Sequence, residues 1–285
     1  CWPDVLDVAR SVLVRFYDKD SGTLLGCGFI WKRGLVVTAA HLFEGMPDGT
    51  EVTVQFENDQ RIAGHVIAKA PGAADVAIVR LQDATMTSRV AKISSCKPRN
   101  GEFIGCAAAA KHCQNLLTPV GTVVATNQQF VGVGKEVDAL QFLQVGFQTL
   151  PGMSGAPVLN AFGEVVGMME KRFEDYGLAL HASFVDAVAT RMLAGRDPVP
   201  SLGVVLKNPP TYPALGRDHL VVTDVSANGL GQQAGLQSGD HLVSVNAVHC
   251  SSVAAVRNAL AESTAQNVCL VVSRAGKTIN LVASI

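Results

Sequence analysis

Three polar side chains stand where a chain could carry out acyl-transfer chemistry. His41 ends one apolar run, Asp75 opens another, and Ser154 lies in the small-residue stretch Gly152–Pro157. In such chemistry the serine hydroxyl attacks a carbonyl carbon and histidine takes its proton. Aspartate orients the histidine and balances the charge of the imidazolium. The sequence therefore offers a complete set of groups for a serine hydrolase, in the order His, Asp, Ser.

The backbone around the serine adds a further element. The N–H groups of Gly152 and Ser154 could bind the oxyanion that develops on the carbonyl, and a side chain at position 152 would obstruct that approach. Taken singly, each residue has a structural explanation: a satisfied histidine at a strand end, an aspartate in a turn, a serine in a glycine turn. Their shared order and context favour the catalytic interpretation.

Short strands separated by Gly, Asp and Asn turns are predicted to position these residues. The first set of expected strands is Ser11–Tyr17, Thr23–Trp31, Leu35–Thr38, Glu51–Glu57, Arg61–Ala70, Asp75–Leu81 and Val90–Ser94. The second set is Phe103–Ala109, Leu117–Ala125, Leu140–Phe147, Pro157–Asn160, Glu164–Glu170 and Gly177–Ser183. Each set predicts a closed antiparallel barrel. His41 and Asp75 would then come from one barrel and Ser154 from the other, with the chemistry in the cleft between them.

The spacing of apolar residues changes after the second set of expected strands. Phe184, Val188 and Met192 follow helical spacing, with Ser183 as the expected N-cap. Gly, Asp and Pro residues then interrupt the pattern. We expect an all-β domain over residues 1–195, a linker over 196–200, and a small α+β domain over 201–285.

The composition excludes several classes of protein. The chain has 285 residues, 48% of them hydrophobic and 16% charged, with a net charge of −1. It carries no basic patch for nucleic acid, and no apolar run approaches the roughly 20 residues of a membrane span. The seven cysteines favour buried free thiols over disulfides or a metal site, and no cofactor is expected. The chain opens at Cys1 without Met, which predicts a processed or trimmed product.

The motifs resemble a known family. Thr38-Ala-Ala-His41, Asp75-Val-Ala-Ile-Val79 and Gly152-Met-Ser-Gly-Ala-Pro157 resemble the catalytic motifs of trypsin-like serine proteases with two β-barrels. Gly26-Cys-Gly-Phe-Ile30 and Gly177-Leu-Ala-Leu180 are similar to strands of the HtrA (Deg) branch. The resemblance implies a Ser-His-Asp endopeptidase of protein quality control or regulated proteolysis. The α/β-hydrolase alternative needs another residue order and a glycine at position 156.

The C-terminal segment resembles a PDZ domain of the HtrA type. Leu202-Gly-Val-Val205, Ala234-Gly-Leu-Gln-Ser-Gly-Asp-His-Leu242 and Val245-Asn246 carry this likeness. Such a domain binds C-terminal peptides by β-augmentation. The residues expected to hold the peptide are Leu202, Gly203, Val204, Val253, Val256 and Leu260.

Two residues depart from the family's pattern. Met153 replaces its usual Asn or Asp, and Ala156 replaces its second glycine. They motivate an alternative function, a protease-derived scaffold that binds proteins with weak or lost catalysis. An acid six residues before the serine would select Lys or Arg in relatives, but this chain has Gln148. We therefore expect cleavage after small or medium apolar residues, with Ala179 and Leu180 also near the pocket.

The resemblance also implies assembly and location. It predicts a homotrimer packed through the protease domains, with Trp2 or Phe16 as contacts. It favours an organelle such as the mitochondrion, or the bacterial periplasm, without deciding between them.

Overall fold

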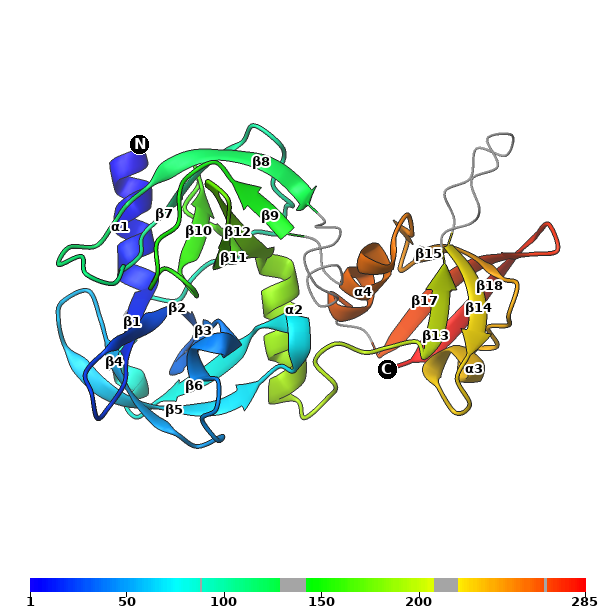
Figure 1. The fold of residues 1–285 in the computed structure, drawn as a ribbon, viewed down its shortest axis with the longest axis horizontal. Helices are drawn as coiled ribbons and strands as arrows, with labels where there is room; N and C mark the ends of the chain where they lie inside the picture. The colour runs from blue at the N-terminus through cyan, green and yellow to red at the C-terminus, as the bar shows by residue number, and fades with distance from the viewer. Residues whose placement is uncertain (88, 129–141, 208–219, 264–265) are drawn as a thin grey trace. The chain divides into compact units, whose positions relative to one another are not determined.

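The computed structural model describes residues 1–87, 89–128, 142–207, 220–263 and 266–285. Contacts divide these residues into two units, each described below by itself (Figure 1). The first comprises residues 1–128 and 142–196, and the second continues from Asp197 to Ile285. The division falls inside the segment expected as the linker, and the domain boundaries themselves stay a prediction.

Two closed antiparallel barrels of six strands each form the first unit, and this confirms the predicted fold class. The first barrel has the order β1-β2-β3-β6-β5-β4. Its strands are β1 (Leu13–Tyr17), β2 (Leu24–Lys32), β3 (Leu35–Thr38), β4 (Glu51–Gln55), β5 (Arg61–Lys69) and β6 (Ala77–Leu81). The second barrel has the order β10-β11-β12-β9-β8-β7. Its strands are β7 (Phe103–Cys106), β8 (Val120–Gln128), β9 (Phe142–Val145), β10 (Pro157–Asn160), β11 (Val165–Phe173) and β12 (Tyr176–His181).

The interior of the first barrel is apolar and aromatic. Phe16 and Phe43 are fully buried there, and their rings meet edge to face with centroids 5.5 Å apart. An edge-to-face pair adds to the stabilisation that burial gives each ring. Phe16 is therefore a core residue, and the expectation that it contacts a neighbouring subunit is wrong.

A helix that the sequence analysis missed begins the chain. Helix α1 (Trp2–Val12) contacts β7 and β10, and it buries Val5, Ala9 and Val12 (Figure 1). The spacing of these residues, at i, i+4 and i+7, is the helical signal that was available in the sequence. The indole of Trp2 lies beside Gly105, where an added Cβ would come within 2.8 Å of the ring.

Two further expectations need correction. The predicted strand Val90–Ser94 is reduced to an isolated bridge between Ile93 and Val165. Helix α2 (Ala182–Leu193) is present, but its N-cap is His181 and not Ser183. Short 3₁₀ turns, η1 (Ala40–Phe43), η2 (Gly72–Ala74) and η3 (Ala84–Met86), complete the described part of this unit.

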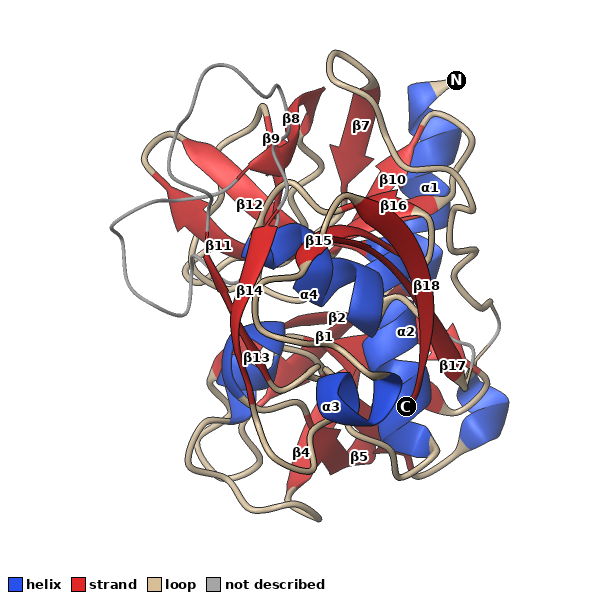
Figure 2. Cartoon of the chain, turned by 90° about the vertical axis from the view of Figure 1, so that its right-hand side faces the viewer, coloured by secondary structure: helices blue, strands red, loops and turns tan. Residues whose placement is uncertain are grey.

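The second unit is a sheet with two helices, and strands and helices are distinguished by colour in Figure 2. Its strands are β13 (Val204–Lys207), β14 (Leu220–Val225), β15 (His241–Val245), β16 (Val248–His249), β17 (Asn267–Arg274) and β18 (Lys277–Ser284). Helix α3 (Leu230–Ala234) ends at Gly235, which adopts φ +88°, the left-handed conformation in which a glycine commonly ends a helix. Helix α4 (Val253–Ala261) begins at Ser252, whose hydroxyl accepts the Ala255 N–H.

All seven cysteines are free, but they are not all buried. Cys27, Cys106 and Cys250 are buried, as expected, whereas the other four, Cys1, Cys96, Cys113 and Cys269, are exposed. The described residues contain no group of three or more His, Cys, Asp or Glu side chains arranged for a metal ion. Among the described helices, none has the length and apolar character needed to cross a bilayer.

Candidate active site

His41 and Asp75 are held together by two hydrogen bonds. Strand β3 leads into η1, which carries His41, and Asp75 ends η2 just before β6. The imidazole Nδ1 lies 2.7 Å from Oδ2 of Asp75, and the His41 backbone N–H donates to Oδ1 at 2.8 Å. The carboxylate therefore fixes both the backbone and the ring of His41. With Nδ1 bonded in this way, Nε2 is left as the nitrogen that can accept a proton.

The backbone conformation of Asp75 is energetically unfavourable for a residue with a side chain. Its φ of +43° lies in the left-handed region, which a non-glycine residue adopts only when other contacts determine it. Those contacts are the two bonds to His41 and a third from the Ala40 N–H to the Asp75 carbonyl at 3.2 Å. Asp75 was expected to begin a strand, but β6 starts at Ala77. The aspartate is in a turn shaped around the histidine.

Asp75 also raises the pKa of His41. Its hydrogen bond favours the charged imidazolium and raises the pKa of His41 above the ordinary value of 6.5, although partial burial of the ring opposes this. The Asp75 side chain is 10% exposed and that of His41 is 43% exposed. The aspartate is thus enclosed, while the imidazole faces solvent and is open to a substrate.

Ser154 lies in a turn that is fastened to the first barrel. The Ser154 carbonyl accepts the N–H of Cys27 in β2 at 2.8 Å. The next residue, Gly155, has φ +86°, and a Cβ there would lie 1.9 Å from the Cys27 carbonyl oxygen. Only glycine fits this crossing, because the backbone conformation and the space both exclude a side chain. The turn therefore presents Ser154 at a fixed place between the barrels.

The Ser154 hydroxyl is bonded within its own barrel. Its Oγ donates to the backbone carbonyl of Glu170 in β11 at 2.9 Å. A hydroxyl has one proton to donate, so this bond excludes simultaneous donation to His41. The structure thus joins His41 to Asp75 by hydrogen bonds, and the hydroxyl proton of Ser154 is bonded to Glu170.

The backbone amides predicted to bind an oxyanion are available. Gly152 has φ +101°, and a Cβ there would come within 2.9 Å of the Lys111 nitrogen. Within the described residues, the N–H groups of Gly152 and Ser154 have no hydrogen-bond acceptor in the protein. Two such donors beside a serine could stabilise negative charge on a substrate oxygen.

A cleft of about 250 Å³ opens beside Ser154. The residues that line it are Thr149, Leu150, Pro151, Met153, Ser154, Met169, Glu170, Lys171 and Arg172. Three residues expected near a substrate pocket are absent from this lining: Gln148 is exposed, and Ala179 and Leu180 are buried in β12. Their role at a substrate pocket stays a prediction. Met153 is 2% exposed, and its sulfur accepts the Leu150 N–H at 3.2 Å. This methionine is therefore part of the cleft wall.

Sequence reasoning missed Glu170. Its side chain is 7% exposed, and one carboxylate oxygen contacts Nζ of Lys171 at 2.7 Å. Burial raises its pKa to about 7, since a charged carboxylate loses water there, and Lys171 opposes the shift. The available signal was an acid following four apolar residues, Val165–Met169 with one glycine, in a strand predicted to face the core.

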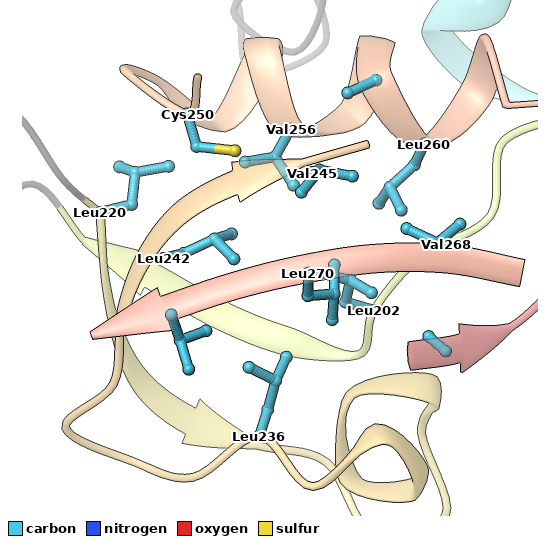
Figure 3. Packing of buried hydrophobic residues seen from close by; sticks show 13 residues of the cluster. Leu202, Leu220, Leu236, Leu242, Val245, Cys250, Val256, Leu260, Val268 and Leu270 are labelled. Carbon is cyan, nitrogen blue, oxygen red and sulfur yellow. The ribbon is translucent and has the colours of Figure 1, made fainter. Parts of the chain in front are cut away.

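In the second unit, three of the six residues expected to bind a peptide are in the core, and Gly203 is half-buried. Leu202, Val256 and Leu260 are 2–3% exposed and point toward one another between the sheet and α4 (Figure 3). Val204 packs partly against this cluster, and Val253 is 38% exposed. Strand β13, which contains Val204, lies at the end of the sheet order and can pair with an added strand.

Asp240, which follows Gly239 in the PDZ-like motif Ala234–Leu242, has a structural role. Asp240 is fully buried, and the Arg274 guanidinium contacts its two oxygens at 2.7 and 2.8 Å. The Gln237 N–H also donates to Asp240, at 2.9 Å. These bonds hold the pKa of Asp240 below its usual value against the opposing effect of burial, which is the largest single contribution. The pair joins the loop before β15 to the end of β17.

The two barrels and the smaller sheet unit correspond to two known domain families. The trypsin-like peptidase domain family matches residues 26–168, and the PDZ domain family matches residues 221–274. The chain belongs to the trypsin-like peptidase family. Relatives of the chain include HtrA and DegP-like proteases, and the PDZ match follows the peptidase match along the sequence.

Individual relatives agree with this assignment. A Chlamydia trachomatis protein, "Probable periplasmic serine endoprotease DegP-like", is 27% identical over 276 residues, covering 90% of this chain and 52% of that protein. "Serine protease Do-like HtrB" of Bacillus subtilis is 30% identical over 166 residues, covering 51% of this chain and 36% of that one. The chain spans about half the length of the first of these relatives and about a third of the second.

A solved structure, "HtrA-type protease AlgW with decapeptide", superposes with a TM-score of 0.73. It covers 100% of this chain and 98% of that one at 18% identity, so the likeness concerns the fold.

Proposed function

We propose that this chain is an active serine endopeptidase in which His41, Asp75 and Ser154 form the catalytic triad. The observation that carries the proposal is the His41–Asp75 pair, bonded at 2.7 and 2.8 Å, in the same unit as a serine turn with two unpaired amides. In this mechanism Ser154 rotates from the Glu170 carbonyl to His41. It attacks the scissile carbonyl as the imidazole takes its proton, and the Gly152 and Ser154 N–H groups bind the oxyanion.

The proposal is tested by proteolysis of an unfolded protein substrate by the full chain. Ser154→Ala removes the nucleophile and is expected to abolish both cleavage and labelling by a serine-directed phosphonate. Ser95→Ala, at an exposed serine of the same unit, is the matched control and should leave both unchanged. Cleavage or labelling that persists in Ser154→Ala would contradict the assignment.

We further propose that the cleft accepts small or medium apolar side chains at P1. Leu150, Pro151, Met153 and Met169 supply an apolar wall, and the acid in the cleft, Glu170, is already paired with Lys171. A profile over a peptide library measures this preference. Dominance of Lys or Arg at P1 would show that Glu170 is free to bind a cation.

The PDZ domain is proposed to bind C-terminal peptides at β13, with Val204 and the exposed Val253 as contacts. Assembly as a homotrimer through the protease unit is also proposed from family membership. Trp2 is packed against Gly105, and this leaves only its partly exposed surface for a neighbour.

A second function is favoured by the position of the serine hydroxyl. Because Oγ donates to Glu170 and not to His41, and Ala156 is fully buried in the turn, the chain could act as a protein-binding scaffold with little catalysis. The proteolysis assay separates the two functions: a wild-type chain that binds peptides, cleaves nothing and resists the phosphonate is a scaffold.

A further inference from the structure

Glu170 occupies an irregular position in β11. The pairing of β11 with β12 shifts between Met169 and Lys171, so Glu170 is the residue without a direct partner at this bulge. Bulges redirect a side chain out of the regular alternation of a strand. Here the backbone carbonyl of Glu170 holds the Ser154 hydroxyl at 2.9 Å, and its side chain enters the wall of the cleft.

The carboxyl group of Glu170 is enclosed and only half satisfied. One oxygen contacts Nζ of Lys171, which also lies 5.1 Å from the Phe142 ring centroid. The other oxygen, Oε2, is buried and has no hydrogen-bond partner. A core carboxyl group without a function is costly to keep, because burial of an unpaired polar atom lowers stability.

The groups that act electrostatically on this carboxyl belong to the proposed catalytic centre. After burial and Lys171, the neighbours that shift the pKa of Glu170 are Asp75, which raises it, and His41, which lowers it. The relation is reciprocal, since the charge of Glu170 raises the pKa of His41 and Lys171 lowers it. Glu170 is thus a second acid near the imidazole, in addition to Asp75.

We propose that Glu170 is a positioning residue of the active centre, a second carboxyl group that controls the protonation of His41 and takes no part in the bond changes of the substrate. When Glu170 is ionised, its negative charge stabilises the imidazolium that forms as Ser154 attacks. When it is protonated, only Asp75 does so. The kinetic part of this proposal rests on the proposed protease function, whereas the titration of His41 does not.

The direct test follows the His41 ring by nuclear magnetic resonance in the full chain carrying Ser154→Ala, which prevents self-cleavage. The histidine signal is assigned by its loss in His41→Gln. In the parent chain we expect a titration with two overlapping steps, because His41 and Glu170 interact and ionise in neighbouring ranges of pH. Glu170→Gln, similar in shape and uncharged, should leave a single step and move the midpoint of His41 to lower pH.

Three variants make the result specific. Glu174→Gln removes one negative charge from the exposed turn four residues along, and it should leave the midpoint unchanged. Glu170→Asp retains the carboxyl group and should retain a midpoint above that of Glu170→Gln. Glu170→Thr, a second uncharged and strand-compatible residue, should reproduce the downward shift and serves if Glu170→Gln does not fold.

The pH dependence of kcat/KM supplies the kinetic readout. In Glu170→Gln its rising limb should move to lower pH by the same amount as the His41 titration. A His41 midpoint in Glu170→Gln or Glu170→Thr that matches the Glu174→Gln control, or that rises, overturns the proposal. A shifted titration in a chain that cleaves nothing would support the role of Glu170 while contradicting the proposed protease function.

Discussion

The two barrels of the first unit share a strand count and closure, but they hold the proposed catalytic groups in different hydrogen-bonded states. The first barrel delivers His41 and Asp75 already bonded to each other. The second delivers Ser154 with its hydroxyl donated to a carbonyl of its own barrel. The difference shows where activation must occur. In the proposed mechanism, His41 and Asp75 need no rearrangement, whereas Ser154 must exchange its hydrogen bond to Glu170 for one to His41.

The largest expected effect on activity comes from breaking the His41–Asp75 pair of the first barrel. Asp75→Asn removes the charge that orients and stabilises the imidazole, and kcat/KM should fall by about 10⁴-fold. The folded structure should persist, since the amide keeps one oxygen for the His41 N–H. Circular dichroism alongside kinetics checks both points. A fall in kcat/KM of less than tenfold would mean that the His41–Asp75 pair is not needed for catalysis in the way proposed.

Gly155→Ala tests the fastening of the serine turn to β2. The added methyl group would lie 1.9 Å from the Cys27 carbonyl and 2.4 Å from the Thr38 hydroxyl, at a φ of +86°. We expect the free energy of unfolding to fall by about 3 kcal/mol or more. Gly163→Ala, at φ +75° with no contact nearer than 3.5 Å, controls for the conformational cost alone. Equal losses in denaturant unfolding of the two variants would show that the crossing is not tight.

The smallest effect concerns the pH dependence of activity. His41 must be neutral to accept a proton, and its raised pKa places the rising limb of kcat/KM above pH 6.5. Activity should therefore increase with pH through neutrality. In Asp75→Asn the rising limb of the residual kcat/KM should lie at lower pH than in the wild type, because the main cause of the raised His41 pKa has been removed. A wild-type midpoint below 6.5 would contradict the geometry of the pair.

The sequence predicted more of the fold than of the site. Alternating apolar runs identified most strands of both barrels, and the α3 glycine stop at Gly235 was readable from residue type. Helix α1 was missed because its Pro3 and its adjoining strand obscured an eleven-residue helical pattern. The left-handed conformation of Asp75 and the bulge at Glu170 depend on contacts distant in sequence. No local pattern encodes them.

The cleft shows the same limit. Gln148, expected near a substrate pocket from the resemblance, is absent from the lining of the cleft beside Ser154, and β11 contributes Glu170, Lys171 and Arg172 to that lining. A one-residue irregularity in strand pairing changes which side chains face a pocket. Motif spacing can therefore indicate the reacting residues of such a chain, but it does not determine the residues that line its pocket.

The contacts of Cys27 have a consequence for how this unit opens. Its N–H donates to the Ser154 carbonyl, its carbonyl accepts the Thr38 hydroxyl at 2.5 Å, and its thiol donates to the Gly152 carbonyl at 3.3 Å. The serine turn of one barrel is thus bonded along a strand of the other. Exchange of the Cys27 amide hydrogen with solvent requires that bond to break. Hydrogen exchange at the Cys27 backbone amide therefore reports how often the serine turn separates from β2.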